Sequence, residues 1–280
     1  MSCGLIDLHV HTTASDGQLS PTEVVHKALE FGLTAIAITD HDTIEGIAEA
    51  LEAAGGTSLE VIPAVEISAE MPRDEVHVLG YYVAYQDPSL CSRLTLFRDL
   101  RLKRAQRIMA KLAQMGMPLE WERIQQMAGS GTIGRPHIAR AMLEKGYISS
   151  IDEAFDLYIS RGGPAYVKRP KVSPVEAVQT ILAAQGVPVL AHPLHISSLV
   201  PELAAHGLVG LEVYYPGYTP DEIEFLLQLA AKYGLLVTGG TDFHGEDVQH
   251  SNRLGEVMVP QTVLENLRAY YERHRARAPN

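Results

Sequence analysis

Residues 5–17 contain the main clue to the architecture: Leu5-Ile6-Asp7-Leu8-His9-Val10-His11-Thr12-Thr13-Ala14-Ser15-Asp16-Gly17. The first half is an apolar run of strand length, and it ends in two histidines that are two residues apart. Side chains two apart on a strand point to the same face, so His9 and His11 converge at the end of the strand. Asp16 follows in the next loop. We therefore expect a buried strand that delivers several metal-binding side chains to one place.

The same kind of apolar segment recurs along the chain. Strands are predicted at 5–11, 35–41, 59–68, 75–83, 188–193, 210–215 and 235–244. Most are continuous apolar runs rather than strict alternations, which is typical of strands buried on both faces of a parallel sheet.

Helix-start signals lie between these strands. Ser20-Pro21-Thr22-Glu23, Ser173-Pro174-Val175-Glu176 and Thr219-Pro220-Asp221-Glu222 each combine an N-cap, a proline at the first helical position and a capping-box glutamate. Asp42-Thr43-Ile44-Glu45 offers the same cap without proline. Strands that alternate with helices imply right-handed βαβ units. Seven of them favour a closed or nearly closed α/β barrel, with a doubly wound open sheet as the alternative.

Residues 88–171 interrupt this pattern. Helices alone are predicted there, at 89–115, 120–127, 135–145 and 151–159. We therefore expect a barrel domain made of residues 1–87 and 172–280, with residues 88–171 inserted between the fourth and fifth strands as a helical, substrate-binding cap. The chain has a net charge of −11. Residues 81–171 nevertheless hold 15 Lys and Arg against 8 Asp and Glu. A basic segment in an acidic body indicates an anionic substrate, although solvated surface charges are the simpler explanation.

Composition narrows the class of protein. The two cysteines, Cys3 and Cys91, are far apart, which excludes a disulfide scaffold and fits a reducing compartment. No apolar run approaches the roughly 20 residues that span a bilayer. The first residues do not resemble a signal peptide. We expect a cytoplasmic protein that acts without a membrane and without an obligatory protein partner.

Metal-binding residue types gather at the predicted strand ends. They are His9, His11, Asp16, His41, Glu66, His77, His192, Asp242 and His244. The carboxyl ends of barrel strands meet on one face, where active sites form. Imidazoles and carboxylates without thiolates suit Mn²⁺, Zn²⁺ or Fe²⁺. Nine ligands are too many for one ion, so we expect two or three divalent ions with Glu66 as a bridge. Such centres bind phosphoryl oxygens and activate water, which makes a phosphoesterase the leading interpretation.

Four motifs resemble those of the PHP family, named for polymerases and histidinol phosphatases. Residues 7–17 resemble its opening motif, Thr39-Asp40-His41-Asp42 its second, Ala191-His192-Pro193 its third, and Asp242-Phe243-His244 its fourth. The resemblance implies a distorted (β/α)₇ barrel. It also implies three ligand sets, namely His9, His11, Glu66 and Asp242; Glu66, His77 and His192; and Asp16, His41 and His244.

The helical insertion and Gly134-Arg135-Pro136-His137 resemble one branch of the family, the 3′,5′-nucleoside bisphosphate phosphatases. Some of these also act as 5′-to-3′ exonucleases on short RNA, and bacterial members are cytoplasmic and favour manganese. The resemblance implies removal of the 3′-phosphate from substrates such as pAp, which leaves a 5′-monophosphate. The alternatives are exonuclease action on short RNA, a histidinol-phosphate phosphatase, an amidohydrolase, and a non-catalytic metal-binding accessory domain.

Candidate substrate-binding residues follow from the chemistry of phosphate. Arg135 presents a planar fork that matches phosphate oxygens, and it begins a predicted helix whose N-terminus favours anions. Arg135 and His137 are therefore predicted to bind substrate and to take part in catalysis, with His137 or a water protonating the leaving group. Lys168 and Arg169 are weaker substrate-binding candidates. Asp242 is predicted to be catalytic as a metal ligand.

Overall fold

The computed structural model describes residues 5–71, 75–129, 131–168, 172–245 and 252–275. Its centre is one seven-stranded sheet in which the strands follow chain order. The strands are β1 (Leu5–Val10), β2 (Leu33–Ile38), β3 (Glu60–Glu70), β4 (Glu75–Tyr81), β5 (Val187–Leu190), β6 (Gly210–Tyr214) and β7 (Leu236–Gly239). A parallel bridge between Val10 and Phe243, just after β7, joins the two edges. The amide of His11 donates to the carbonyl of Phe243 at 2.9 Å. These contacts close the sheet, so the predicted (β/α)₇ barrel is confirmed.

The distortion of the barrel lies in β4, which runs antiparallel to both β3 and β5. Only four residues separate β3 from β4 in the chain, and Ser68 pairs with His77 while Glu70 pairs with Glu75. The first residues of β4 therefore lie beside the last residues of β3. The expectation that each ligand follows the carboxyl end of its strand is wrong for His77, which reaches the same face from an amino-terminal end.

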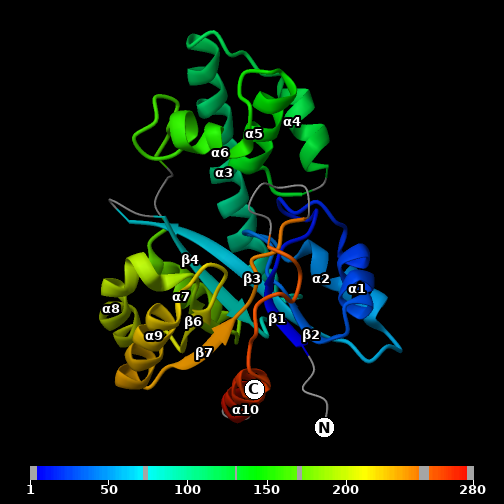
Figure 1. Ribbon diagram of the computed structural model, residues 1–280, viewed down its shortest axis with the longest axis vertical. Coiled ribbons are helices and arrows are strands. Elements are labelled where there is room, and N and C mark those ends of the chain that lie inside the picture. The colour runs from blue at the N-terminus through cyan, green and yellow to red at the C-terminus, as the bar shows by residue number, and fades with distance from the viewer. Residues whose placement is uncertain (1–4, 72–74, 130, 169–171, 246–251, 276–280) are drawn as a thin grey trace.

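Most helices pack around the outside of the barrel (Figure 1). They are α1 (Pro21–Glu30), α2 (Glu45–Ala54), α7 (Pro174–Ala183), α8 (Val200–Ala205) and α9 (Pro220–Tyr233). A 3₁₀ segment, Pro193–Leu199, follows β5 directly. Helix α10 (Gln261–Arg275) covers the end of the barrel opposite the inserted helices (Figure 1). Its Val263, Leu264 and Leu267 pack with Ile6 and Leu8 of β1.

Three of the four predicted helix starts have the predicted side-chain N-cap. Ser20, Ser173 and Thr219 each accept the backbone N–H three residues later. The fourth prediction, a cap from Asp42, is wrong, because α2 begins after Ile44 without a side-chain cap. Asp42 instead has a left-handed φ of 53° and accepts the backbone N–H of Ser68 at 2.9 Å. The Asp42 carboxylate thus accepts hydrogen bonds from Ser68 of β3 and from the Arg101 guanidinium.

The inserted helices form a lobe above the barrel (Figure 1). They are α3 (Pro88–Gln114), α4 (Trp121–Ala128), α5 (Arg135–Glu144) and α6 (Ile151–Ala154), which continues into the π-helical turn Phe155–Ile159. Ile108, Leu112, Ile124, Ile138 and Met142 belong to an apolar cluster within this lobe. The division of the chain into a barrel domain and a substrate-binding cap stays a prediction.

No helix in the described ranges combines the length and the apolar character that a bilayer-spanning segment needs. The cytoplasmic location stays a prediction.

Candidate metal centre

All nine predicted metal ligands are buried or partly buried, and they face one another at the barrel end below the lobe. Three groups of side chains bring their donor atoms within 4.8 Å of one another: His11, Asp16, His41 and His244; His9, His11, Glu66 and Asp242; and His41, Glu66 and His77. Residues that are up to 235 positions apart in the sequence thus meet in one cluster, because each lies within or just after a strand of the same sheet.

Glu66 lies at the middle of the cluster. One carboxylate oxygen, Oε2, is 3.2 Å from His11 Nε2 and 3.0 Å from His41 Nδ1. The other, Oε1, is 3.0 Å from His77 Nδ1 and 3.6 Å from His192 Nε2. The two oxygens therefore face different sets of imidazoles, which is the arrangement expected of a bridging carboxylate.

His192 stands at the edge of this cluster, with its Nε2 3.2 Å from His77 Nδ1. It has a left-handed backbone conformation, with φ of 30°, and Asp242 has φ of 53°. A non-glycine residue in such a conformation costs about 1–3 kcal/mol and persists only where the surroundings enforce it. Strain of this kind concentrates at functional sites, and here it falls on two predicted ligands.

A second layer of side chains orients the first. Glu212 is fully buried, and its Oε1 lies 2.8 Å from His9 Nδ1 while its Oε2 accepts the backbone N–H of His192 at 2.8 Å. The Nε2 of His9 is thereby left to face Glu66 and Asp242. The hydroxyl of Tyr215 donates to Asp242 Oδ2 at 2.9 Å, which leaves Oδ1 toward the histidines. Such partners fix the ring orientation of metal-binding histidines.

The cluster fits divalent cations because its polar atoms lack other partners. His9 Nε2, His11 Nε2, Asp16 Oδ1 and both carboxylate oxygens of Glu66 are buried, and within the described residues none makes a hydrogen bond. Leaving one such group unsatisfied costs about 1–3 kcal/mol. Burial disfavours charge on His11, but the Asp242 and Glu66 carboxylates outweigh it and raise the pKa of the imidazole to about 10. The carboxylates thus require positive charge, and two or three ions held by nitrogen and oxygen would supply it.

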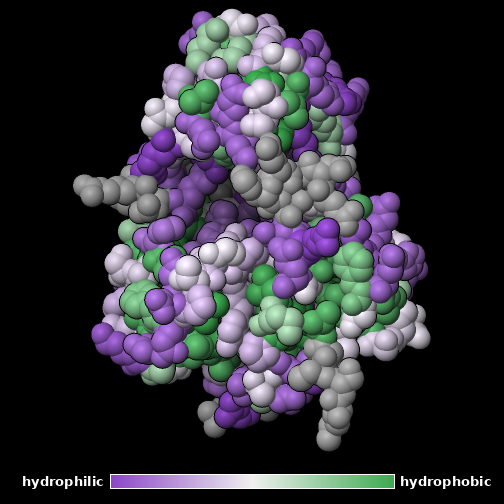
Figure 2. Space-filling view, in the orientation of Figure 1, coloured by the Kyte–Doolittle hydropathy of each residue, from purple (hydrophilic) through white to green (hydrophobic). Residues whose placement is uncertain are grey.

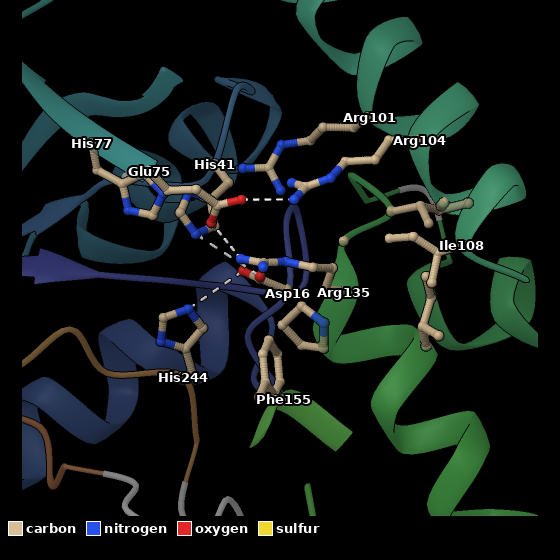
Figure 3. A pocket seen from close by; sticks show the side chains of 15 residues that line it. Asp16, His41, Glu75, His77, Arg101, Arg104, Ile108, Arg135, Phe155 and His244 are labelled. Carbon is tan, nitrogen blue, oxygen red and sulfur yellow. Dashed lines mark hydrogen bonds and ion pairs between the residues drawn. The ribbon is translucent and has the colours of Figure 1, made fainter. Parts of the chain in front are cut away.

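A cationic pocket opens beside the centre (Figure 3). It is lined by Asp16, His41, His77 and His244 on the barrel side and by Arg101, Arg104, Arg135 and Phe155 on the lobe side. The space between these side chains, part of which is open to solvent, is about 610 Å³. The molecule is visibly hollowed between lobe and barrel, with hydrophilic surface around the opening (Figure 2).

Glu75 of β4 organises the arginines of this pocket. Its Oε1 accepts from Arg104 at 2.8 Å, and its Oε2 accepts from Arg135. Burial opposes its charge, but the two guanidinium groups outweigh burial and hold the pKa of Glu75 far below its usual range. The Arg135 guanidinium also lies 5.4 Å from the centre of the Phe155 ring. The arginines are thus held in place near the metal ligands.

The other predicted substrate-binding residues are placed differently. His137 is only 1% exposed and is not among the residues that line the pocket. Its Nδ1 accepts the backbone N–H of Gly134 at 3.0 Å, and burial lowers the pKa of the ring to about 4. Lys168 is exposed, and Arg169 lies outside the described residues. The roles proposed for all of them from sequence stay predictions.

Sequence reasoning missed Arg101, Arg104 and Glu75. Arg101 and Arg104 are three residues apart on a predicted helix and so share one face, which is a signal that was available. No local sequence signal indicates the role of Glu75, because its position depends on the direction of β4.

Comparison with known proteins identifies the family. The model of the PHP domain matches residues 7–159. The chain belongs to the PHP family. It is 37% identical over 245 residues to a 5′-3′ exoribonuclease of Haemophilus influenzae, covering 85% of this chain and 89% of the relative. It is 32% identical over 273 residues to a 3′,5′-nucleoside bisphosphate phosphatase of Chromobacterium violaceum, covering 91% and 94%.

Among solved structures, one from Bifidobacterium adolescentis assigned as a metal-dependent phosphoesterase superposes with a TM-score of 0.87. It is 33% identical and covers 96% of each chain. With the ligand cluster described above, these similarities show that this PHP protein is a metal-dependent phosphoesterase, a hydrolase of phosphoric esters.

Divalent metal is expected to stabilise this fold as well as to support turnover. Mn²⁺ at 100- to 1,000-fold its Kd should add about 2.7–4 kcal/mol per ion, which corresponds to a rise of about 5–15 °C in Tm for a chain of this size. Differential scanning fluorimetry of chelator-treated protein, with and without added Mn²⁺, measures this shift. A Tm that is the same with and without Mn²⁺ would contradict a preformed metal centre.

Glu212→Gln is expected to lower kcat/KM by about 10- to 100-fold, the usual effect of losing a side chain that orients a metal ligand. The amide keeps the size of the side chain but can present only one oxygen to two donors, His9 and the His192 backbone. Phosphate-release kinetics together with metal content measure the effect. Glu202→Gln, on α8 at the surface, serves as the control and should leave both unchanged.

Proposed function

We propose that this PHP phosphoesterase removes the 3′-phosphate of nucleoside 3′,5′-bisphosphates such as pAp, giving the 5′-monophosphate and phosphate. One observation carries the proposal: a pocket with three arginines opens directly onto the metal-ligand cluster. A substrate with two phosphates can place one at the metal centre and the other against the guanidinium groups. Similarity to the Chromobacterium violaceum phosphatase supports the same reaction.

The nine clustered side chains would hold the ions, with Glu66 shared between them. Mn²⁺ is the proposed metal, since it accepts mixed imidazole and carboxylate ligands, and Zn²⁺ or Fe²⁺ are the alternatives. When bound, such ions polarise a phosphoryl group and activate a water molecule. Glu212 and Tyr215 keep the ligand atoms aimed at the centre, and Asp242 has its catalytic role as a ligand.

The lobe would act as the substrate-binding cap. Arg135 presents a planar fork toward the centre, and Phe155 packs against that fork. Glu75 accepts hydrogen bonds from Arg104 and Arg135 and so keeps both guanidinium groups beside the centre. For His137 we propose a positioning role, because its Nδ1 accepts the Gly134 N–H just before Arg135. Lys168 is exposed at the return to the barrel, where it would meet only an extended substrate.

Hydrolysis of short RNA in the 5′-to-3′ direction is the second candidate function. The Haemophilus influenzae exoribonuclease is slightly more similar to this chain than the bisphosphate phosphatase is. Both reactions break the bond between phosphorus and a 3′-oxygen, and both use a 5′-phosphate as the second anion. A histidinol-phosphate phosphatase needs no second anion site, and an accessory domain would bind metal without turnover.

The test is a panel of phosphate esters presented to Mn²⁺-loaded protein. The panel contains pAp, 3′-AMP, 5′-AMP, histidinol phosphate and a 5′-phosphorylated RNA oligonucleotide. We expect pAp to be hydrolysed with a kcat/KM about 100-fold above either monophosphate, since removing one partner of a buried charge pair costs about 2–5 kcal/mol. Preference for histidinol phosphate, or no release from any ester, would refute the proposal. Strong salt dependence on RNA would favour the second candidate function.

A further inference from the structure

A series of aromatic rings leads away from the metal-ligand cluster. The His192 and Tyr215 ring centroids are 5.5 Å apart, and those of Tyr215 and Tyr218 are 5.3 Å apart. The Tyr215 hydroxyl is engaged by Asp242, and the Tyr218 hydroxyl accepts the backbone N–H of Leu194 at 3.4 Å. The two tyrosine rings are thus held at their hydroxyl ends, and both side chains are partly exposed.

Two hollows follow this series. The first adjoins the metal centre and is lined by Asp16, Arg140, Asp242, His244, Tyr215 and Asn252, among others. The second, which we name the tyrosine pocket, is lined by Tyr214, Tyr215, Tyr218, Asn252, Val257 and Met258 among others. Tyr215 and Asn252 line both hollows, so the tyrosine pocket adjoins the hollow beside the metal centre. The cationic pocket with Arg101, Arg104 and Arg135, which we name the arginine pocket, adjoins the same centre through Asp16 and His244.

The arginine pocket and the tyrosine pocket differ in chemistry. The arginine pocket carries three guanidinium groups. Among the described residues that line the tyrosine pocket, Glu256 is the only charged one, so a phosphate is disfavoured there. Tyrosine faces and the 75%-exposed Met258 instead suit a flat, uncharged ring. Stacking of a base on an aromatic side chain contributes about 1–3 kcal/mol and tolerates any base.

We propose that the tyrosine pocket binds the nucleobase of the nucleotide that follows the scissile phosphate. This inference rests on the proposed function, including its second candidate reaction on short RNA, and it names the residues that would bind the second base. Water adds to phosphorus, and the bond from phosphorus to the 3′-oxygen of the first nucleotide breaks. That oxygen takes a proton, which yields a 5′-monophosphate, and the second nucleotide leaves with the phosphate on its 5′-oxygen. With a bisphosphate, the same cleavage releases inorganic phosphate.

The test compares pAp with the dinucleotide pApA in wild-type protein and in Tyr218→Ala, Tyr218→Phe and Met258→Ala. Tyr218→Ala should lower kcat/KM for pApA by about 10-fold through KM, while pAp turnover stays within twofold. Tyr218→Phe keeps the ring and should retain both activities. The Met258 side chain is exposed, so Met258→Ala should fold normally. It should lower kcat/KM for pApA by a smaller factor than Tyr218→Ala and leave pAp turnover unchanged. Leu96→Ala, another exposed apolar side chain at 53%, should change neither.

A binding measurement separates this inference from the proposed function. The dinucleotide carries 2-aminopurine as its second base, and its fluorescence is followed with metal-free protein, where turnover does not occur. Wild-type protein should quench the fluorescence, and Tyr218→Ala should not. Quenching lost in Tyr218→Ala supports the tyrosine pocket even if pAp is not hydrolysed. Equal losses on pAp and pApA, unchanged pApA kinetics, or absence of quenching in the wild type would each overturn it.

Discussion

Glu66→Gln is expected to reduce phosphate release from a bisphosphate by at least about 10³-fold, because removing a single electrostatic group from such a site already costs about 10²–10³. The two oxygens of the Glu66 carboxylate face different sets of histidines, at 3.0–3.6 Å. The amide is neutral and offers one acceptor oxygen. Steady-state kinetics with Mn²⁺ and metal content by mass spectrometry measure the two consequences, which are lower turnover and fewer bound ions.

The matched control is Glu60→Gln on the same strand. Glu60 begins β3 at the far end of the barrel, where it meets Arg268 of α10. That pair is partly exposed, so the change should cost little stability and leave activity intact. A Glu66→Gln protein that keeps near-normal turnover and its full metal content would refute the bridging role. Circular dichroism distinguishes loss of the site from loss of the fold.

The ligand cluster could be predicted because its information is local. His9 and His11 at the end of one apolar run, and Asp242 and His244 after another, each indicate a strand that ends in polar residues. A barrel gathers such ends whatever the details of packing. The helix starts at Ser20, Ser173 and Thr219 were equally local. The predicted elements therefore lie within a few residues of those observed, although the last predicted strand extended to His244 while β7 ends at Gly239.

The features that escaped prediction depend on how distant elements meet. The direction of β4 is set by the hairpin with β3, and it brings both Glu75 and His77 to the mouth of the barrel. Asp42 has every local mark of an N-cap, but the packing of α3 over β3 makes it a partner of Ser68 and Arg101. Local propensity decides such a residue only where no tertiary contact competes for its side chain.

This placement of Glu75 also changes how the basic insertion should be understood. The net positive charge of residues 81–171 indicated an anionic substrate, yet Arg104 and Arg135 already share a carboxylate and Arg101 meets Asp42. The pocket is therefore less cationic than a count of arginines implies. Specificity then depends on which guanidinium can turn toward a phosphate. Arg104 is held by both Glu75 and the Val167 carbonyl, whereas Arg135 is held by Glu75 and the Phe155 face.

Arg135→Ala is accordingly expected to lower kcat/KM for pAp by about 10²-fold, since truncating one member of a buried, hydrogen-bonded charge pair costs about 2–5 kcal/mol. Turnover of 3′-AMP, which has no 5′-phosphate, should change by less than threefold. Glu75 keeps Arg104 as a partner, so the fold should survive. Arg135→Lys retains the charge but loses the planar fork, so its activity on pAp should lie between that of the wild type and that of Arg135→Ala.

The control for Arg135→Ala is Arg93→Ala, which removes an exposed guanidinium paired with Glu176 on the outside of α3. Such a surface pair contributes about 0–1 kcal/mol, so neither substrate should be affected. Parallel kinetics on pAp and 3′-AMP give the decisive ratio. If Arg135→Ala slows both substrates equally, Arg135 acts on the metal centre rather than on a second phosphate. If it slows neither, the second anion lies elsewhere, and the arginine pocket no longer explains a preference for bisphosphates.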